Sequence, residues 1–289
     1  MSAKENTGDR PQQIVPADKT QDSLALVIPC AATDYDNLCE LLRRLIAHSA
    51  SQPDRIVVAL SESNVLSSEQ KHDLEALLRQ WHRGASEARK STTYMVVYTP
   101  HKALAGANRN RAIDYCQFSD IIVCHDADDD IHPQKIAILR HWFSKRPDVL
   151  HICHWAMAYG YEWPQYDDFD AVPTDECEAV HRIGLKFYTN GPLMRGMSAF
   201  RRAVHDAVRF RDNYKYGEDT CFCREVQGHF GPRSLVIRAP LAKYDLFACM
   251  PKEVLNQRSD WQRKKEPRGL LLDRTKPDWT AHVTKRQTH

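Results

Sequence analysis

Over the first half of the chain, short apolar runs alternate with longer segments of helical periodicity. The apolar runs are rich in valine, isoleucine and leucine, which is typical of strands buried on both faces; they cover residues 24–29, 55–60, 94–98 and 121–124. Between them, apolar residues recur three or four positions apart, as on the buried face of an amphipathic helix; these segments cover residues 38–46, 74–81 and 104–116. Strands alternating with helices predict an α/β fold with a Rossmann-like, mostly parallel sheet flanked by helices.

The pattern is less regular after residue 150. Residues 156–195 carry many aromatic residues, prolines and acids, which indicates an irregular insertion rather than another strand–helix unit. No internal repeat or low-complexity linker separates the two halves, so we expect a single domain. The expected elements of the second half are strands at 149–155, 235–237 and 241–245, a short helix at 198–208, and a longer helix at 218–227 that Gly228 ends.

The composition is that of an ordinary globular protein. Of 289 residues, 42% are hydrophobic and 27% charged, and 40 basic against 38 acidic side chains give a formal charge of +2. This balance predicts no nucleic-acid partner. No apolar run approaches the roughly 20 residues that cross a bilayer, and the N-terminus has no hydrophobic signal core. The nine cysteines lack paired Cys-x-x-Cys spacing and the histidines form no zinc motif, so we expect reduced thiols and a soluble, cytoplasmic protein.

A cluster of acids directly follows the strand at 121–124. Asp126, Asp128, Asp129 and Asp130 stand within five positions, and Pro133 precedes the next helical pattern. If the backbone stays extended, Asp126 and Asp128 face one way and Asp129 the other. Two carboxylates on one side suit a hard divalent cation, Mn²⁺ or Mg²⁺. The alternative is an acidic turn that only caps the following helix.

Five segments together resemble the family-two type of nucleotide-sugar glycosyltransferases, which have the glycosyltransferase-A fold. The resemblance covers roughly residues 24–245, and its strength lies in the order of the motifs. The segments are Val27-Ile28-Pro29, Ala105 to Asn110, His125 to Asp129, Gly196 to Arg202, and Gly217 to Arg224.

The resemblance implies an inverting, metal-dependent transfer of a sugar from a nucleoside diphosphate sugar to a hydroxyl of a glycan or another acceptor. It implies that Asp128 ligates the metal and that Asp126 contacts the nucleoside or ligates through water. Pro29 and Arg109 resemble residues near the nucleotide. Asp219 is then the candidate general base, while Glu218 supports the acceptor or the start of its helix. The alternative for this acidic pair is an electrostatic helix cap.

Two segments depart from the family pattern. In the family, an acid after the second strand holds the nucleobase. This chain has Ala59-Leu60-Ser61-Glu62-Ser63 at that place, so that Glu62 is the only possible substitute. Where relatives often place a histidine ligand, this chain has Lys243-Tyr244-Asp245, which makes Asp245 a candidate third metal ligand. The nucleobase, the sugar, the acceptor and the oligomeric state therefore stay open.

The composition of the two ends and the extent of the resemblance together predict a division of the chain. A disordered lead-in, 1–22, precedes a catalytic domain, 23–250, with a nucleotide-sugar half (23–150) and an acceptor half (151–250); a basic tail, 251–289, follows. Two other functions compete with this interpretation. A catalytically inactive protein that binds nucleotides or glycans remains open because of the altered segment at 59–63. A sugar nucleotidyltransferase is disfavoured, because no glycine-rich phosphate loop follows the first strand.

Overall fold

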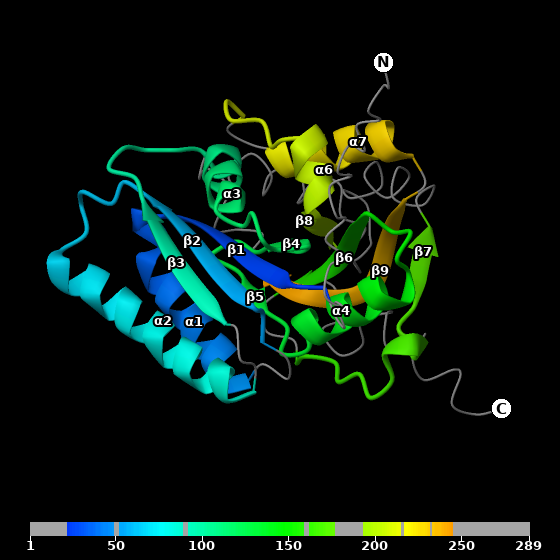
Figure 1. Ribbon diagram of the computed structural model, residues 1–289, viewed down its shortest axis with the longest axis horizontal. Helices are drawn as coiled ribbons and strands as arrows, with labels where there is room; N and C mark the ends of the chain where they lie inside the picture. Colours follow the sequence, from blue (N-terminus) through cyan, green and yellow to red (C-terminus); the bar gives the residue numbers. More distant parts are fainter. Residues whose placement is uncertain are drawn as a thin grey trace, which may run out of the picture.

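The computed structural model describes residues 22–48, 52–88, 92–158, 162–176, 193–214, 217–231 and 233–244. In this part of the chain, helices cover both faces of one nine-stranded sheet (Figure 1). The predicted tail at 251–289 and nearly all of the predicted lead-in at 1–22 lie outside the described residues. No helix in the described ranges is long and apolar enough to cross a bilayer.

The first half follows the predicted alternation of strands and helices. Its elements are β1 (Leu24–Ala31), α1 (Tyr35–His48), β2 (Arg55–Ser61), α2 (Ser68–Ala88), β3 (Thr93–Tyr98), α3 (Ala105–Asp114), β4 (Ile121–Cys124), β5 (Asp130–Ile131) and α4 (Lys135–Lys145). The second half has β6 (His151–Ala158), β7 (Thr174–Glu176), β8 (Leu193–Arg201), α6 (Arg202–Ala207), α7 (Glu218–Phe230) and β9 (Ser234–Tyr244). Short 3-10 turns lie at Ala32–Asp34 and Phe169–Ala171.

The sheet has the order β3-β2-β1-β4-β8-β6-β9-β5, with β7 also paired to β9. Strands β3, β2, β1 and β4 are parallel. Strand β8 is antiparallel to both β4 and β6, while β6 and β9 are parallel. The predicted Rossmann-like, mostly parallel sheet is therefore confirmed, and the antiparallel pairings lie in the second half and at its junction with the first.

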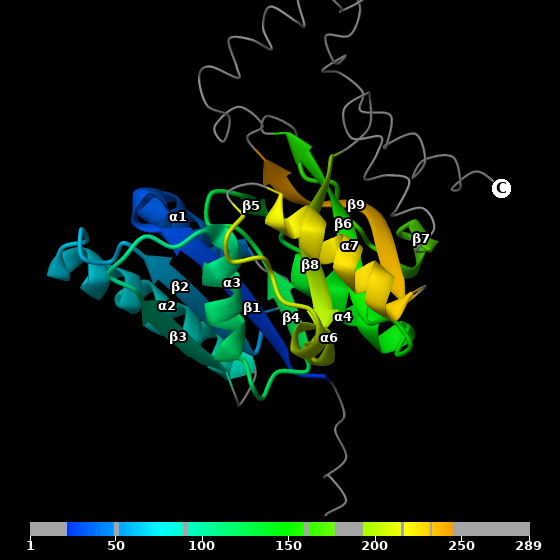
Figure 2. The ribbon, with the colours of Figure 1, turned by 90° about the horizontal axis from the view of Figure 1, so that it is seen from above.

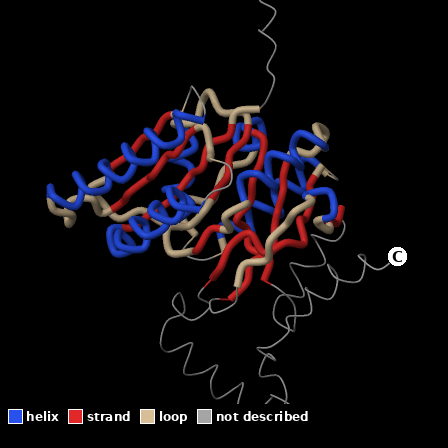
Figure 3. Tube along the Cα trace, turned by 90° about the horizontal axis from the view of Figure 1, so that it is seen from below, coloured by secondary structure: helices blue, strands red, loops and turns tan. Residues whose placement is uncertain are grey.

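Alternate residues of the central strands belong to two separate hydrophobic cores, one on each face of the sheet. In β1, Leu26 and Ile28 belong to the larger core, which includes apolar residues of α1, α2 and α4. Ala25 and Val27 belong to the second core, with residues of α3, α6 and α7. Helices lie over the sheet in the views from above and from below (Figures 2 and 3). This double burial explains why β1, β2 and β4 lack a polar face.

Three predicted elements of the second half differ from the structure. Residues 198–201 belong to β8 rather than to the start of a helix, because β8 pairs with strands on both sides; only Arg202–Ala207 is helical. Helix α7 continues through Gly228 and ends before Gly231, which takes the left-handed φ of 64°. The two strands predicted at 235–245 are one strand, β9, whose register to β6 shifts around Pro240.

Two buried histidines lead us to expect acid destabilisation. Burial lowers the pKa of His132 to about 4, although its ring hydrogen bond to the Pro164 carbonyl opposes the shift. Burial also lowers the pKa of His205 to about 4. The unfolded chain, with histidine pKa near 6.5, therefore binds more protons between these values. The free energy of unfolding should be greatest above pH 6.5 and fall on the order of 2–3 kcal/mol per histidine as pH drops through 4.

Urea unfolding between pH 7 and pH 5 would test this expectation. A His205→Asn variant should show a smaller loss of stability over that interval than the wild type. The matched control is His229→Asn on the exposed side of α7, which should keep the full slope. Equal slopes in all three proteins would contradict the assignment to the buried ring.

Candidate active site

Several acidic side chains meet at one edge of the sheet. The chain leaves the carboxyl ends of β1, β2 and β4 there, and ligands bind at such ends in α/β proteins. Burial raises the pKa of Asp34, and the nearby carboxylates of Asp128, Asp126 and Glu62 raise it further. The predicted acids are thus joined by Asp34, which was not predicted from the sequence although it lies only three residues after the end of β1.

The acidic turn after β4 holds three carboxylates. One ligand atom each of Asp126, Asp128 and Asp129 can be chosen so that all lie within 4.8 Å of one another. Asp126 and Asp128 are partly exposed, whereas Asp129 is buried. The predicted opposition of Asp129 is wrong, because the backbone turns at Ala127–Asp128 and the Asp129 amide donates to the Asp126 carbonyl at 3.3 Å. A group of carboxylate oxygens this close fits a hard divalent cation.

The rest of the sequence cluster lies elsewhere. Asp130 begins β5 and forms an ion pair with Arg44 of α1. His125 is fully buried, and its Nδ1 lies 3.1 Å from the ammonium of Lys135, which is also buried. Because an ammonium only donates, Nδ1 accepts this hydrogen bond. The turn is therefore held by strand pairing on one side and by the first residue of α4 on the other.

Arg109 connects the acidic turn to a distant helix. Its guanidinium, on α3, is buried and donates from Nη2 to Asp126 Oδ1 at 2.5 Å and from Nη1 to Glu218 Oε1. Burial alone disfavours the charge, but the carboxylates of Asp126, Glu218 and Asp219 outweigh it and hold the pKa of Arg109 above its ordinary value. The structure thus brings together the predicted residues of β4, α3 and α7.

The two acids of α7 have different surroundings. Glu218 is buried and points its carboxylate at Arg109, whereas Asp219 is partly exposed. Asp219 Oδ1 accepts a hydrogen bond from the Thr220 amide at 2.6 Å. Gly217 precedes them with a left-handed φ of 75°, which admits the sharp entry into the helix. Of the pair, Asp219 is the carboxylate that a substrate can reach.

Gly106 permits the close approach of α3 to the segment before α7. A Cβ at this position would lie 2.3 Å from the Arg211 carbonyl oxygen, so Gly106→Ala must displace backbone. We expect a loss of about 1–3 kcal/mol in unfolding free energy. The control is Gly84→Ala in α2, where a Cβ meets no atom within 4 Å and should stabilise the helix by about 0.5–1 kcal/mol. Chemical denaturation measures both; similar effects of the two substitutions would contradict the steric argument.

The remaining candidates occupy different places. Pro29 is buried within β1, opposite Ala59 of β2, and the strand continues to Ala31, two residues beyond the predicted run at 24–29. Glu62 follows β2 with a left-handed φ of 56°, a strained conformation for a residue with a side chain, and its amide donates to the His101 carbonyl at 3.0 Å. Asp245 lies outside the described residues.

An aromatic side chain of the second half packs close to β5, which follows the acidic turn and pairs with β9. The Lys243 ammonium lies 4.2 Å from the centre of the Trp163 ring, which also packs edge-on against His132. Tyr166 is buried, whereas Tyr214 is 41% exposed. Tyr166 therefore belongs to the core.

Comparisons with known proteins identify the fold. No protein-family model and no curated protein matches the sequence. Among solved structures, S. aureus TarS in complex with UDP-GlcNAc is similar with a TM-score of 0.54 and 17% identity, over 77% of this chain and 58% of that one. M. tuberculosis glucosyl-3-phosphoglycerate synthase is similar with a TM-score of 0.51 and 12% identity, over 81% and 75% of the two chains.

The likeness extends to a complex of the same synthase with Mn²⁺, UDP and glucosyl-3-phosphoglycerate, at a TM-score of 0.50 and 14% identity over 83% and 76% of the two chains. The present chain spans 60% of the S. aureus TarS fragment 1–349. At these identities the likeness concerns the fold. The chain has the glycosyltransferase-A fold that its sequence motifs led us to expect.

Proposed function

We propose that this chain is a glycosyltransferase that moves a sugar from a nucleoside diphosphate sugar to an acceptor hydroxyl, in a metal-dependent reaction that inverts the anomeric carbon. The observation that carries the proposal is the buried Arg109, which ties the acidic turn to the first turn of α7. A carboxylate cluster and a separate reachable carboxylate, Asp219, thereby lie at one site. The fold shared with TarS and with glucosyl-3-phosphoglycerate synthase supports this choice.

We assign the metal site to the acidic turn. Asp126 and Asp128 are the ligands expected from sequence, and Asp129 supplies a third oxygen close by. Asp245 stays a predicted further ligand. A bound Mn²⁺ or Mg²⁺ would offset the negative charge that grows on the departing diphosphate. The donor then lies over the carboxyl ends of β1, β2 and β4, in the nucleotide-sugar half at 23–150, with Pro29 and Glu62 beside the nucleoside.

Asp219 is assigned as the general base. The acceptor hydroxyl must lose a proton as it attacks the anomeric carbon, and a carboxylate on the side away from the diphosphate can take it. Attack from that side inverts the configuration. Glu218 and Arg109 are positioning residues, since their charged side chains form an ion pair with each other inside the protein. Holding α7 against the acidic turn sets the distance between base and donor, on which the rate depends steeply.

Metal-dependent nucleotide binding provides the first test. We expect Mn²⁺ to increase the thermal stabilisation given by UDP or GDP, by about 5 °C at ligand concentrations near 100 times Kd. Asp128→Asn should remove the Mn²⁺-dependent part of the shift. The matched control is Asp130→Asn, in the same run of acids but ion-paired to Arg44, which should keep it. Equal shifts with and without Mn²⁺ in the wild type would count against the metal site.

A donor panel then separates an enzyme from a binding protein. We expect release of UDP or GDP from at least one nucleotide sugar in the presence of Mn²⁺, faster when an acceptor is present. Nucleotide binding that depends on Mn²⁺ without release from any donor would indicate the inactive, nucleotide-binding alternative. Anomeric configuration of the product, read by NMR, tests inversion separately.

A further inference from the structure

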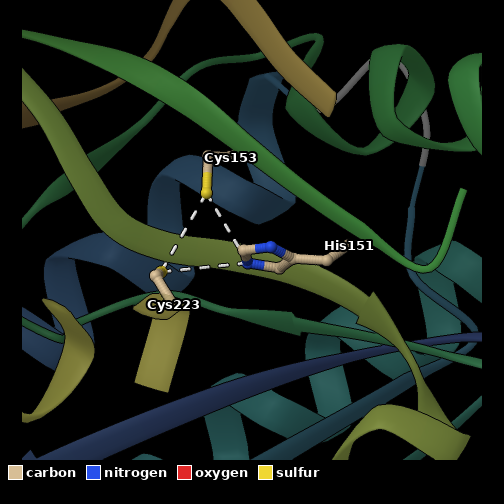
Figure 4. Close-up of side chains that lie close together, drawn as sticks. All are labelled: His151, Cys153 and Cys223. Carbon is tan, nitrogen blue, oxygen red and sulfur yellow. Dashed lines mark hydrogen bonds between the residues drawn. The ribbon is translucent and has the colours of Figure 1, made fainter. Parts of the chain in front are cut away.

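A second group of metal-ligand side chains lies between the sheet and α7. His151 and Cys153 stand two positions apart on β6, so both side chains leave the strand on the same side. Ile152, between them, belongs to the larger core on the opposite face. Cys223 comes from α7, and the three side chains turn toward one another (Figure 4). In the described part of the chain, only this group and the acidic turn gather three such ligands.

The spacing of the three ligand atoms suits a tetrahedral ion. Cys153 Sγ lies 3.5 Å from His151 Nε2, Cys223 Sγ lies 3.9 Å from the same nitrogen, and the two sulfur atoms are 4.0 Å apart. Bonds of about 2.3 Å from zinc to sulfur and about 2.0 Å to nitrogen place tetrahedral ligands about 3.6–3.8 Å apart. An ion therefore fits at the centre with shifts of a few tenths of an ångström, smaller than a rotamer change.

The surroundings of the group favour a soft metal ion. His151 Nδ1 lies 3.3 Å from Ser234 Oγ, which leaves Nε2 as the metal-facing nitrogen and provides the outer hydrogen bond that metal-bound histidines usually make. All three ligand residues are buried. Two thiolates and one neutral imidazole balance the charge of a divalent cation, so the complex does not bury a net charge. Thiolate and imidazole ligands select zinc over the oxygen-preferring Mn²⁺ and Mg²⁺.

We propose that His151, Cys153 and Cys223 bind a structural Zn²⁺ ion that clips α7 to β6. Binding forms two Zn–S bonds and one Zn–N bond and releases the two thiol protons to solvent. A water molecule completes the coordination and keeps the complex neutral, since the described residues offer three protein ligands. The clip holds the helix whose first turn carries Glu218 and Asp219. The site is separate from the acidic turn and does not depend on the proposed transfer reaction.

Metal analysis of the full-length chain tests the proposal directly. Protein purified under reducing conditions without chelator should contain about one zinc ion per chain, as measured by inductively coupled plasma mass spectrometry. Replacing zinc with Co²⁺ should produce the near-ultraviolet sulfur-to-cobalt charge-transfer absorption of thiolate ligation, which carboxylate sites cannot give. Both measurements use the wild-type protein, so they stand even if a variant folds poorly.

Variants locate the ion. Cys153→Ala/Cys223→Ala should lower the zinc content at least about tenfold and abolish the cobalt–thiolate band. Cys116→Ala, at another fully buried cysteine, and Asp128→Asn, in the acidic turn, should keep both. Chelator should lower the Tm of the wild type but not that of the double variant. Wild-type protein without zinc and without a thiolate band after Co²⁺ addition would overturn the proposal, as would a mass lower by two hydrogen atoms that reveals a Cys153–Cys223 disulfide instead.

Discussion

Replacing Asp219 with asparagine is expected to lower the turnover number of sugar transfer about 10²- to 10⁴-fold, the range over which general-base catalysis acts. Asparagine keeps the size of the side chain and can still accept the Thr220 amide hydrogen bond, so α7 should begin as before. It cannot take the acceptor proton. Nucleotide affinity should change little, because Asp219 lies on the acceptor side of the proposed site. Steady-state kinetics together with Mn²⁺-dependent UDP or GDP binding measure the two effects separately.

The matched control lies on the same helix. Glu225 is an exposed acid of α7 that pairs with Arg211, and Glu225→Gln should leave the turnover number within a few-fold of the wild type. Asp219→Asn with nearly normal turnover would remove the residue from the reaction. The base would then have to be sought among the other acids at the carboxyl edge of the sheet.

Replacing Arg109 with methionine is expected to cost about 3 kcal/mol in the free energy of unfolding. The substitution leaves the buried Glu218 carboxylate and Asp126 without their shared cation, and breaking such a pair typically costs about 3–5 kcal/mol. The lower end applies because the Asp126 side chain keeps 23% of its surface exposed and can take up water. Urea unfolding at neutral pH gives the value.

Two companion variants show whether the cost comes from the unpaired charges. Arg109→Met/Glu218→Gln removes the buried carboxylate as well and should recover part of the lost stability. Arg209→Met breaks an exposed pair with Asp114, for which a loss below about 1 kcal/mol is expected. Should the double variant be no more stable than Arg109→Met, loss of packing against Phe210, whose ring centre is 5.4 Å from the guanidinium carbon, would explain the cost instead.

The first half of the fold could be predicted because its signals are local. Strands buried on both faces produce continuous apolar runs, and β1, β2 and β4 lie where those runs lie. The acidic turn follows from the same logic, since acids directly after a buried strand must emerge at the sheet edge. The position of Asp129 beside Asp126 and Asp128 could not be derived from the sequence. It depends on a turn, in which side chains no longer alternate between two sides as they do in an extended strand.

The second half could be predicted less well because its elements depend on partners distant in the sequence. Residues 193–201 become a strand only through β4 and β6, and Pro240 interrupts the apolar signal of a strand that in fact continues past it. The cluster of His151, Cys153 and Cys223 likewise cannot be recognised from a spacing motif in the sequence, since two ligands come from a strand and the third from a separate helix. By contrast, the order of the family motifs predicts that the acids at 126–128 and at 218–219 serve one site, whereas the ion pairs of Arg109 with Asp126 and Glu218 are known only from the structure.

The position of β8 also bears on how such a molecule can move. This strand of the second half pairs with β4, aligning Ile121 with Arg201 and Val123 with Ala199, and pairs on its other side with β6. A jaw-like opening between the halves would have to break these backbone ladders, in contrast to enzymes whose lobes rotate about a linker. If the proposed transfer takes place at the carboxyl edge of the sheet, donor and acceptor meet on a sheet of fixed shape, and rotation of the two halves does not gate the reaction.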